Sequence, residues 1–147
     1  MSKKIVILFG TESGNAEFAA EDMAAEISGR EVEIVDMTDF DLDDLSTENF
    51  YLVICSTHGE GDLPSGATPL LEALESSAPN MSGIEYAMFG LGDSSYENYS
   101  KGSEHIDNKF AALGAKRVGE YGRHDAHTGT LPNDDAVAWT RKIISEF

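Results

Sequence analysis

The sequence has little of what would mark a secreted, membrane-bound or nucleic-acid-binding protein. It contains one cysteine, so no internal disulfide can form, and no apolar run approaches the length of a membrane span. The apolar stretch after Lys3 and Lys4 is too short for the core of a signal peptide. Basic residues are also scarce: ten Lys and Arg stand against 27 Asp and Glu, and the formal net charge is −17. We therefore expect a cytoplasmic chain with no nucleic-acid or membrane partner, whose protein partners present a basic face.

The length and the order of the apolar patterns indicate one domain of the α/β class. The 147 residues fit a single domain spanning 1–147, with no internal repeat or linker. Strands are predicted at 4–9, 31–36, 50–56, 84–90 and 116–121, and helices at 15–28, 67–76, 102–113 and after Pro132. Such alternation is typical of a parallel sheet with helices on both faces. Five strands fit the order 2-1-3-4-5 better than they fit the six-stranded dinucleotide fold.

Three of the predicted strands run directly into polar loops that are rich in small residues. The loops read TESGNAE (11–17), THGEGDLP (57–64) and LGDSSYENY (91–99). The carboxyl ends of parallel strands lie along one edge of a sheet, so the three loops should converge there. In the predicted strand order the crevice lies between strands 1 and 3, where the first two loops meet. The sequence therefore predicts a ligand cleft at this edge.

The first loop suits a phosphate monoester. Its hydroxyl and amide side chains offer short donors, and the free N–H groups at the start of the next helix lie at the positive end of the helix dipole. The loop has no lysine, so it is not a nucleoside-triphosphate loop, and Gly-x-Gly-x-x-Gly is absent. A plain strand-to-helix turn, capped by Ser13 or Asn15, explains this loop about as well.

The second and third loops each carry a flat ring. His58 and Tyr96 stand in facing loops, where they could enclose a planar heteroaromatic ligand. Taken singly, each is also explained as an ordinary loop histidine or a partly buried surface tyrosine. The case for a ligand therefore depends on the three loops together.

Together the three loops resemble those of the flavodoxin family of the short-chain type. They are also similar to MioC-type flavodoxins and to the FMN domains of cytochrome P450 reductase and sulfite reductase. The resemblance covers the whole chain and implies a flavodoxin-like three-layer sandwich that binds FMN without a covalent bond. The residues that it assigns to the cofactor are Thr11, Glu12, Ser13, Gly14, Asn15, Ala16, Ser56, Thr57, His58, Gly59, Glu60, Gly61, Leu91, Gly92, Asp93, Tyr96 and Tyr99.

The resemblance also implies roles for these residues. Those of the first loop would hold the phosphate, Tyr96 would stack on the outer face of the flavin, and His58 would cover the inner face. The peptide after Gly59 would turn when the flavin is reduced, and glycine lowers the steric cost of that turn. Ala16 and His58 depart from the family pattern, because many members have Thr and Trp or Tyr there. Acidic residues near the ring, such as Glu60 and Asp93, would lower the reduction potential.

The function implied by the resemblance is electron transfer rather than catalysis on a substrate of its own. The protein would be a monomer that cycles FMN through the semiquinone and the hydroquinone. Its donor would be a basic-faced NAD(P)H-dependent flavodoxin reductase or a ferredoxin-type protein, and its acceptors would be redox enzymes. Two alternatives stay open: an FMN-dependent NAD(P)H or quinone oxidoreductase, and a MioC-like partner module that binds flavin weakly.

Several other features are expected to carry no separate site. The acidic stretch 36–45 is interpreted as a solvated loop rather than a docking site, because it follows the second strand, away from the predicted cleft. His124 and His127 lack the further ligands that a metal needs, so no metal site is predicted. Cys55 at a strand end and Trp139 on the last helix are predicted to be buried.

Overall fold

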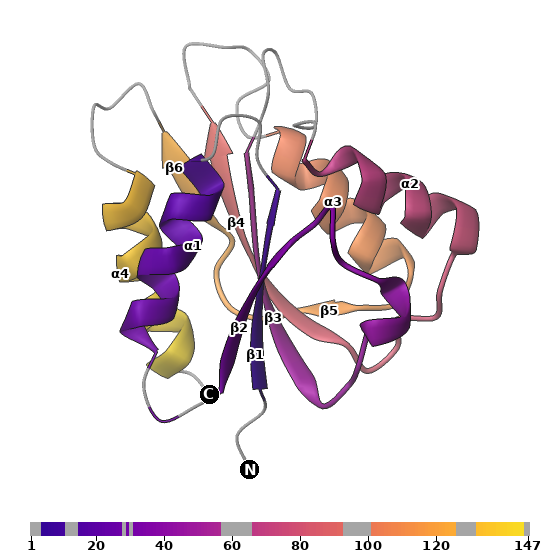
Figure 1. Cartoon of the computed structure of the whole chain (residues 1–147), viewed down its shortest axis with the longest axis horizontal. Helices are drawn as coiled ribbons and strands as arrows, with labels where there is room; N and C mark the ends of the chain where they lie inside the picture. The colour runs from indigo at the N-terminus through magenta and orange to yellow at the C-terminus, as the bar shows by residue number, and fades with distance from the viewer. Residues whose placement is uncertain are drawn as a thin grey trace.

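A parallel sheet runs through the middle of the molecule, between two layers of helices (Figure 1). The computed structural model describes residues 4–10, 15–27, 29, 31–56, 66–92, 101–125 and 132–145. The strand order is β2-β1-β3-β4-β5, with β6 also paired to β4, and every pairing is parallel. The predicted α/β class and the order 2-1-3-4-5 are therefore confirmed.

The elements follow one another along the chain as the apolar pattern predicts. The strands are β1 (Lys4–Gly10), β2 (Val32–Asp36), β3 (Asn49–Ser56), β4 (Glu85–Gly92), β5 (Lys116–Arg117) and β6 (Gly122–Asp125). The helices are α1 (Asn15–Glu26), the 3-10 turn η1 (Leu42–Asp44), α2 (Thr68–Ser77), α3 (Lys101–Ala112) and α4 (Pro132–Ser145). Apart from the fifth strand, the bounds agree with the predictions to within two residues. No helix in the described part of the chain is both long enough and apolar enough to span a membrane.

The prediction of a continuous fifth strand over 116–121 is wrong. The structure has two short strands instead, and both pair with β4: β5 lies against its start and β6 against its end. Between them, Gly119 has a φ of +78°, a conformation that favours glycine and ends an extended strand. The Val118 N–H still donates to the Tyr86 carbonyl at 2.8 Å. The two pieces therefore occupy one strand position, broken in the middle.

The strands of the sheet bury side chains on both faces. One core lies under α1 and α4, where the rings of Phe89 and Trp139 pack with centroids 5.3 Å apart. The other lies under α2 and α3, where Tyr86 meets Phe110 edge to face at 5.0 Å. Cys55 is fully buried in this second core, and Trp139 is 6% exposed. Both residues are therefore buried, as predicted.

The cover over β1 and β2 differs from that over the rest of the sheet. Between β2 and β3 the chain passes through segment 37–48, which contains η1 and no longer helix. Phe40, Leu42 and Leu45 of this segment pack against the core under α2 and α3. A thin, irregular segment therefore covers this corner of the sheet, next to the edge strand β2.

Candidate functional site

The carboxyl ends of β1, β3 and β4 lie next to one another at one edge of the sheet (Figure 1). Gly10 pairs with Cys55, and Cys55 pairs with Gly90. One step further along, Ser56 pairs with Leu91. The strands that precede the three polar loops therefore end in neighbouring, registered positions, which is the arrangement that the sequence predicts for a cleft.

The chain leaves β1 and β3 toward opposite faces of the sheet. Helix α1 follows β1 and packs into the core shared with α4, whereas α2 follows β3 and packs into the core shared with α3. Because β1 and β3 are neighbours, this divergence makes their carboxyl ends the topological switch point of the sheet, which is where open α/β sheets bind ligands. The first N–H groups of α1, from Asn15 onward, also lie at this edge and suit an anion.

Gly10 ends β1 at this switch point, and its lack of a side chain is required by its neighbours. A Cβ atom at this position would lie 2.7 Å from the Met37 sulfur and 2.8 Å from the Ala67 Cβ. Met37 follows β2, and its N–H donates to the Phe9 carbonyl at 2.9 Å, while Ala67 precedes α2. Two chain segments, at Met37 and at Ala67, thus close on the end of β1, which only glycine permits.

Most of the residues that the sequence assigns to the cofactor lie outside the described residues. Those are Thr11, Glu12, Ser13, Gly14, Thr57, His58, Gly59, Glu60, Gly61, Asp93, Tyr96 and Tyr99. Asn15 begins α1, Ser56 ends β3 and Gly92 ends β4, so these three lie at the expected edge. The side chains of Ala16 and Leu91 are buried in the hydrophobic core under α1 and α4. The assignment of all these residues to a cofactor stays a prediction.

A polar cluster ties the start of α3 to the fifth strand position. The hydroxyls of Ser103 and Tyr121 are 2.6 Å apart, and the Arg123 guanidinium lies 4.1 Å from the centre of the Tyr121 ring. Arg123 also pairs with Glu104 at 3.9 Å. Burial raises the pKa of Tyr121 to about 12, so its hydroxyl keeps its proton at neutral pH. The cluster fixes the helix that follows the third loop.

A second polar contact joins β6 to the first turn of α4. The His124 ring, 2% exposed, places Nδ1 2.7 Å from the Asp135 carboxylate in the first turn of α4. The described residues contain no group of His, Cys, Asp and Glu that could hold a metal, and His127 lies outside them. The sequence did not predict this pair. The only sequence pattern that points to this pair is weak: a strand that contains a histidine is followed shortly by a helix whose first turn is acidic.

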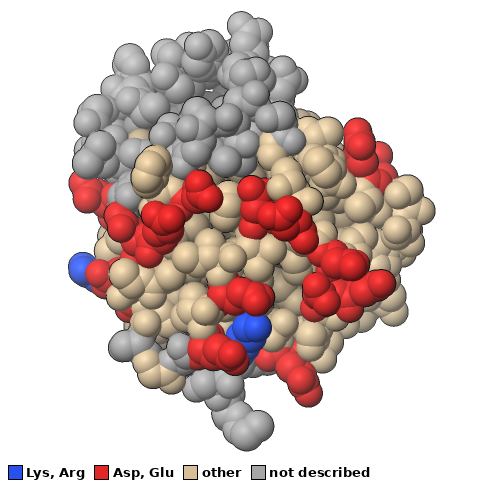
Figure 2. All heavy atoms as spheres, viewed as in Figure 1, with Lys and Arg blue, Asp and Glu red and all other residues tan. Residues whose placement is uncertain are grey.

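The net negative charge is distributed unevenly along the chain. Residues 1–100 hold three Lys and Arg against 20 Asp and Glu, whereas residues 101–147 hold seven of each. The whole net charge of −17 therefore comes from the part that contains β1 to β4 and the three loops. Figure 2 looks onto the β2 side of the molecule, where carboxylates far outnumber basic groups. The field of the protein thus favours cationic partners on this side.

The comparisons with known proteins agree with this geometry. Residues 7–139 match the family model described as Flavodoxin. A cysteine-to-serine mutant of flavodoxin from Pseudomonas aeruginosa has 32% identity and a TM-score of 0.82, with 97% of each chain covered. Protein MioC of Escherichia coli O157:H7 is 30% identical over 141 residues, 96% of both chains.

A further relative is a much longer protein. The sulfite reductase [NADPH] flavoprotein alpha-component of Thiocapsa roseopersicina is 38% identical over 119 residues, which are 79% of this chain and 23% of that protein. The chain thus spans about a quarter of the length of this relative. The family match over most of the chain, together with the strand order, leads to one conclusion: this chain belongs to the flavodoxin family.

Proposed function

We propose that this protein holds FMN non-covalently at the carboxyl edge of its sheet and carries electrons between a reductase and acceptor enzymes. The observation that carries the proposal is the topological switch point between β1 and β3, where the registered ends of the two strands precede the first two polar loops. Family membership implies the same cofactor. FMN supplies the step from two-electron donors to one-electron acceptors.

The residues near this switch point fit FMN in their chemistry. The start of α1 at Asn15 places its first N–H groups at the positive end of the helix dipole, and Thr11 and Ser13 would add hydroxyl donors for a terminal phosphate. Gly10 lets the surrounding segments close on the end of β1. His58 and Tyr96 would cover the two faces of the flavin. No positively charged side chain is needed, because neutral dipoles suffice for the anion.

The charge distribution supports a low reduction potential. Carboxylates around a site disfavour an added negative charge there, and the part of the chain that contains the three loops holds the whole net charge of −17. Glu60 and Asp93 are the acidic residues that we expect nearest to the flavin. The reduced protein would therefore be a strong electron donor.

The same charge suits the partners that we propose. A basic-faced NAD(P)H-dependent flavodoxin reductase, or a ferredoxin-type donor, would be attracted to the acidic side, as would redox acceptor enzymes with basic faces. The protein would act as a monomeric carrier without substrate turnover of its own. We place it in the cytoplasm, where a buried thiol such as that of Cys55 stays reduced.

Cofactor binding and the carrier role are tested separately. We expect one equivalent of FMN to bind purified protein, with a flavin band in the visible spectrum. Ser13→Ala should weaken FMN about tenfold and leave riboflavin unchanged, because riboflavin lacks the phosphate. Ser76→Ala, on exposed α2 surface, is the matched control. Equal losses for the two flavins would contradict a phosphate site in the first loop.

Turnover measurements distinguish the carrier from the alternatives. The carrier should oxidise NADPH only when a separate reductase is added. Steady NADPH turnover by the protein alone would instead favour the FMN-dependent oxidoreductase. The similarity to MioC over 96% of both chains favours, as a second candidate, a partner-binding module that holds flavin weakly. Failure to retain FMN at micromolar concentration would support that candidate.

A further inference from the structure

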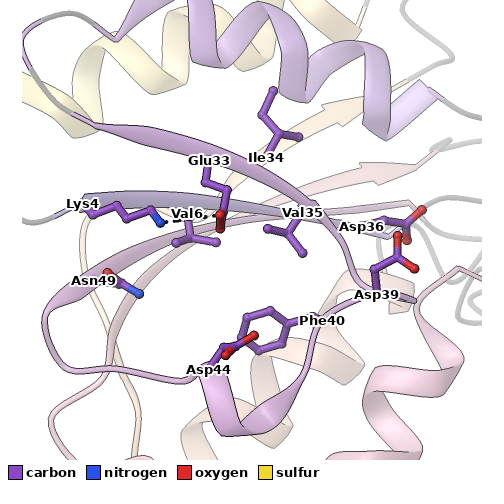
Figure 3. A pocket seen from close by; sticks show the side chains of 10 residues that line it. All are labelled: Lys4, Val6, Glu33, Ile34, Val35, Asp36, Asp39, Phe40, Asp44 and Asn49. Atoms are coloured by element: carbon purple, nitrogen blue, oxygen red, sulfur yellow. Dashed lines mark ion pairs between the residues drawn. The ribbon is translucent and has the colours of Figure 1, made fainter.

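A cavity of about 600 Å³ opens beside the edge strand β2, apart from the switch point between β1 and β3 (Figure 3). Val6, Val35 and Phe40 give it an apolar floor, continuous with the core under α2 and α3. It extends from Asn49 at the start of β3 to Asp36 at the end of β2. Segment 36–45, whose sequence favours a solvated loop, forms one wall of this pocket.

The wall is fastened to the sheet by Tyr51, which lies fully buried in β3. The Tyr51 hydroxyl accepts from the Ser46 N–H at 3.0 Å and from the Asn49 amide at 3.4 Å, and it donates to the Asp44 carbonyl at 3.5 Å. The Phe40 ring meets the Tyr51 ring edge to face at 6.2 Å. The pocket is thus a built feature of the fold, because its wall and floor share a buried anchor.

Carboxylates surround the apolar floor. Asp36 accepts from the Thr38 N–H at 2.9 Å, and Glu33 pairs with Lys4 at 3.5 Å. Within the described residues, the carboxylates of Asp39 and Asp44 have neither a hydrogen-bond nor an ion-pair partner. No group of acidic residues in that part of the chain is arranged to hold a metal ion. The pocket therefore presents two uncompensated negative groups above an apolar surface.

This combination fits a lysine or arginine side chain. The aliphatic stem of such a side chain can lie on Val35 and Phe40 while its charged end reaches Asp39 and Asp44. The Phe40 ring adds a surface that attracts a cation. A metal ion would need converging carboxylates, and an apolar ligand would leave both carboxylates without a counter-charge.

The outer edge of β2, next to the pocket, indicates what kind of molecule would carry this lysine or arginine side chain. Among the described strands, β2 pairs with β1 alone, so its outer edge offers backbone groups to an extended segment. Charges along an edge discourage pairing with like-charged chains, and a second copy of this chain also carries −17. A partner of opposite charge is the one that the edge favours.

We propose that an extended basic segment of a partner protein docks along β2, with one Lys or Arg side chain in the cavity between Val35, Phe40, Asp39 and Asp44. The proposal is independent of FMN, because the pocket shares no residue with the predicted cofactor loops. It gives the protein a second contact, distinct from the carboxyl ends of β1, β3 and β4, where electrons would enter or leave.

The test uses the whole chain and a defined probe, an acetylated and amidated heptapeptide of alternating arginine and valine. Amide chemical shifts on titration should change mainly within 32–49. Asp39→Asn combined with Asp44→Asn should weaken binding about five- to tenfold, as expected for two partly exposed ion pairs. The control, Glu72→Gln with Glu75→Gln on exposed α2 surface, makes the same change in net charge and should weaken binding less than about twofold.

Three results would overturn the proposal. One is equal weakening by the two double variants, which would mean a general charge effect. Another is shifts outside 32–49, which would move the contact elsewhere. The third is binding of N-acetylarginine amide as tightly as the peptide, which would mean a site for small cations rather than for a strand. Circular dichroism of each variant verifies that the fold is retained.

Discussion

Tyr51 and Tyr86 make a matched pair for measuring what a charged partner adds to a buried hydroxyl. They pair in register on β3 and β4, and both are 0% exposed. The Tyr86 hydroxyl donates to the Asp107 carboxylate at 2.7 Å, and the other oxygen of that carboxylate accepts from Arg117 at 2.7 Å. The Tyr51 hydroxyl has neutral partners at 3.0 to 3.5 Å. The substitution to Phe is the same at both positions, so the partners decide the difference.

The expected magnitudes follow from these partners. A hydrogen bond to a charged group contributes about 1.5–3 kcal/mol, and a neutral one about 0.5–1.5 kcal/mol. For Tyr51 only the bond from Ser46 at 3.0 Å has a normal length, because the contacts at 3.4 and 3.5 Å are long and weak. Tyr86→Phe should therefore lower the free energy of unfolding by about 1 kcal/mol more than Tyr51→Phe. With a urea dependence of about 2 kcal/mol per molar, Tyr86→Phe should lower the urea midpoint by about 1 M. The fluorescence of Trp139, the one tryptophan, reports unfolding, and FMN is held at fixed concentration.

A double-mutant cycle with Asp107→Ala tests whether the Asp107 carboxylate causes the larger loss of stability in Tyr86→Phe. Asp107 is 8% exposed, so removing its carboxylate leaves the buried Tyr86 hydroxyl with the Asp107 carbonyl at 3.2 Å. In that background Tyr86→Phe should cost clearly less than in the wild type. If Tyr51→Phe proves as costly as Tyr86→Phe, or if the two effects at Tyr86 and Asp107 simply add, the reasoning fails.

Three further outcomes are expected. Burial raises the pKa values of Cys55 and Tyr121 to about 12, so the contribution of these groups to the free energy of unfolding should be fully present below about pH 9 and be lost as the pH rises toward 12. Urea midpoints measured across that range verify this, and Cys55→Ala should lose less stability than the wild type over the same range. Gly10→Ala places a Cβ 2.7 Å from the Met37 sulfur and 2.8 Å from Ala67, so thermal unfolding should show a loss of about 1–3 kcal/mol, and an unchanged midpoint would refute the clash. Stopped-flow electron transfer from a basic reductase should slow as salt shortens the screening length to about 8 Å, whereas a salt-independent rate would argue against charge steering.

The sequence predicted the sheet well because the central strands carry strong patterns. The run FYLVIC in β3 is buried on both faces, and such a run, followed by a glycine-rich loop, allows few interpretations. The fifth strand was predicted wrongly because its pattern is weak: Lys116 and Arg117 are exposed, and Gly119 breaks the extended chain. Strand β4 also extends past the predicted end at Gly90, because Leu91 is buried by tertiary packing.

The polar contacts were beyond reach of the sequence for a different reason. His124 and Asp135 are 11 residues apart, and Tyr86 and Asp107 are 21 apart, so no local spacing relates them. Their pairing depends on where a strand and a helix meet after folding. The same holds for the pocket beside β2, which needs both the turn of segment 37–48 and the anchor at Tyr51.

The basic residues of the last third strengthen the weakest part of the sheet. Arg117 pairs with Asp107, Arg123 with Glu104, and Lys142 with Glu120, so each pair joins the broken fifth strand position to α3 or α4.

Cations engaged in these pairs are unavailable to the opposite side of the molecule, where β2 and the acidic segment lie. The distribution of charge therefore has two consequences, one at the fifth strand position and one on the β2 side. Ion pairs hold the broken fifth strand position, which has little hydrogen bonding, and Asp39 and Asp44 stay without a cationic partner among the described residues on the side where we propose that a basic partner docks.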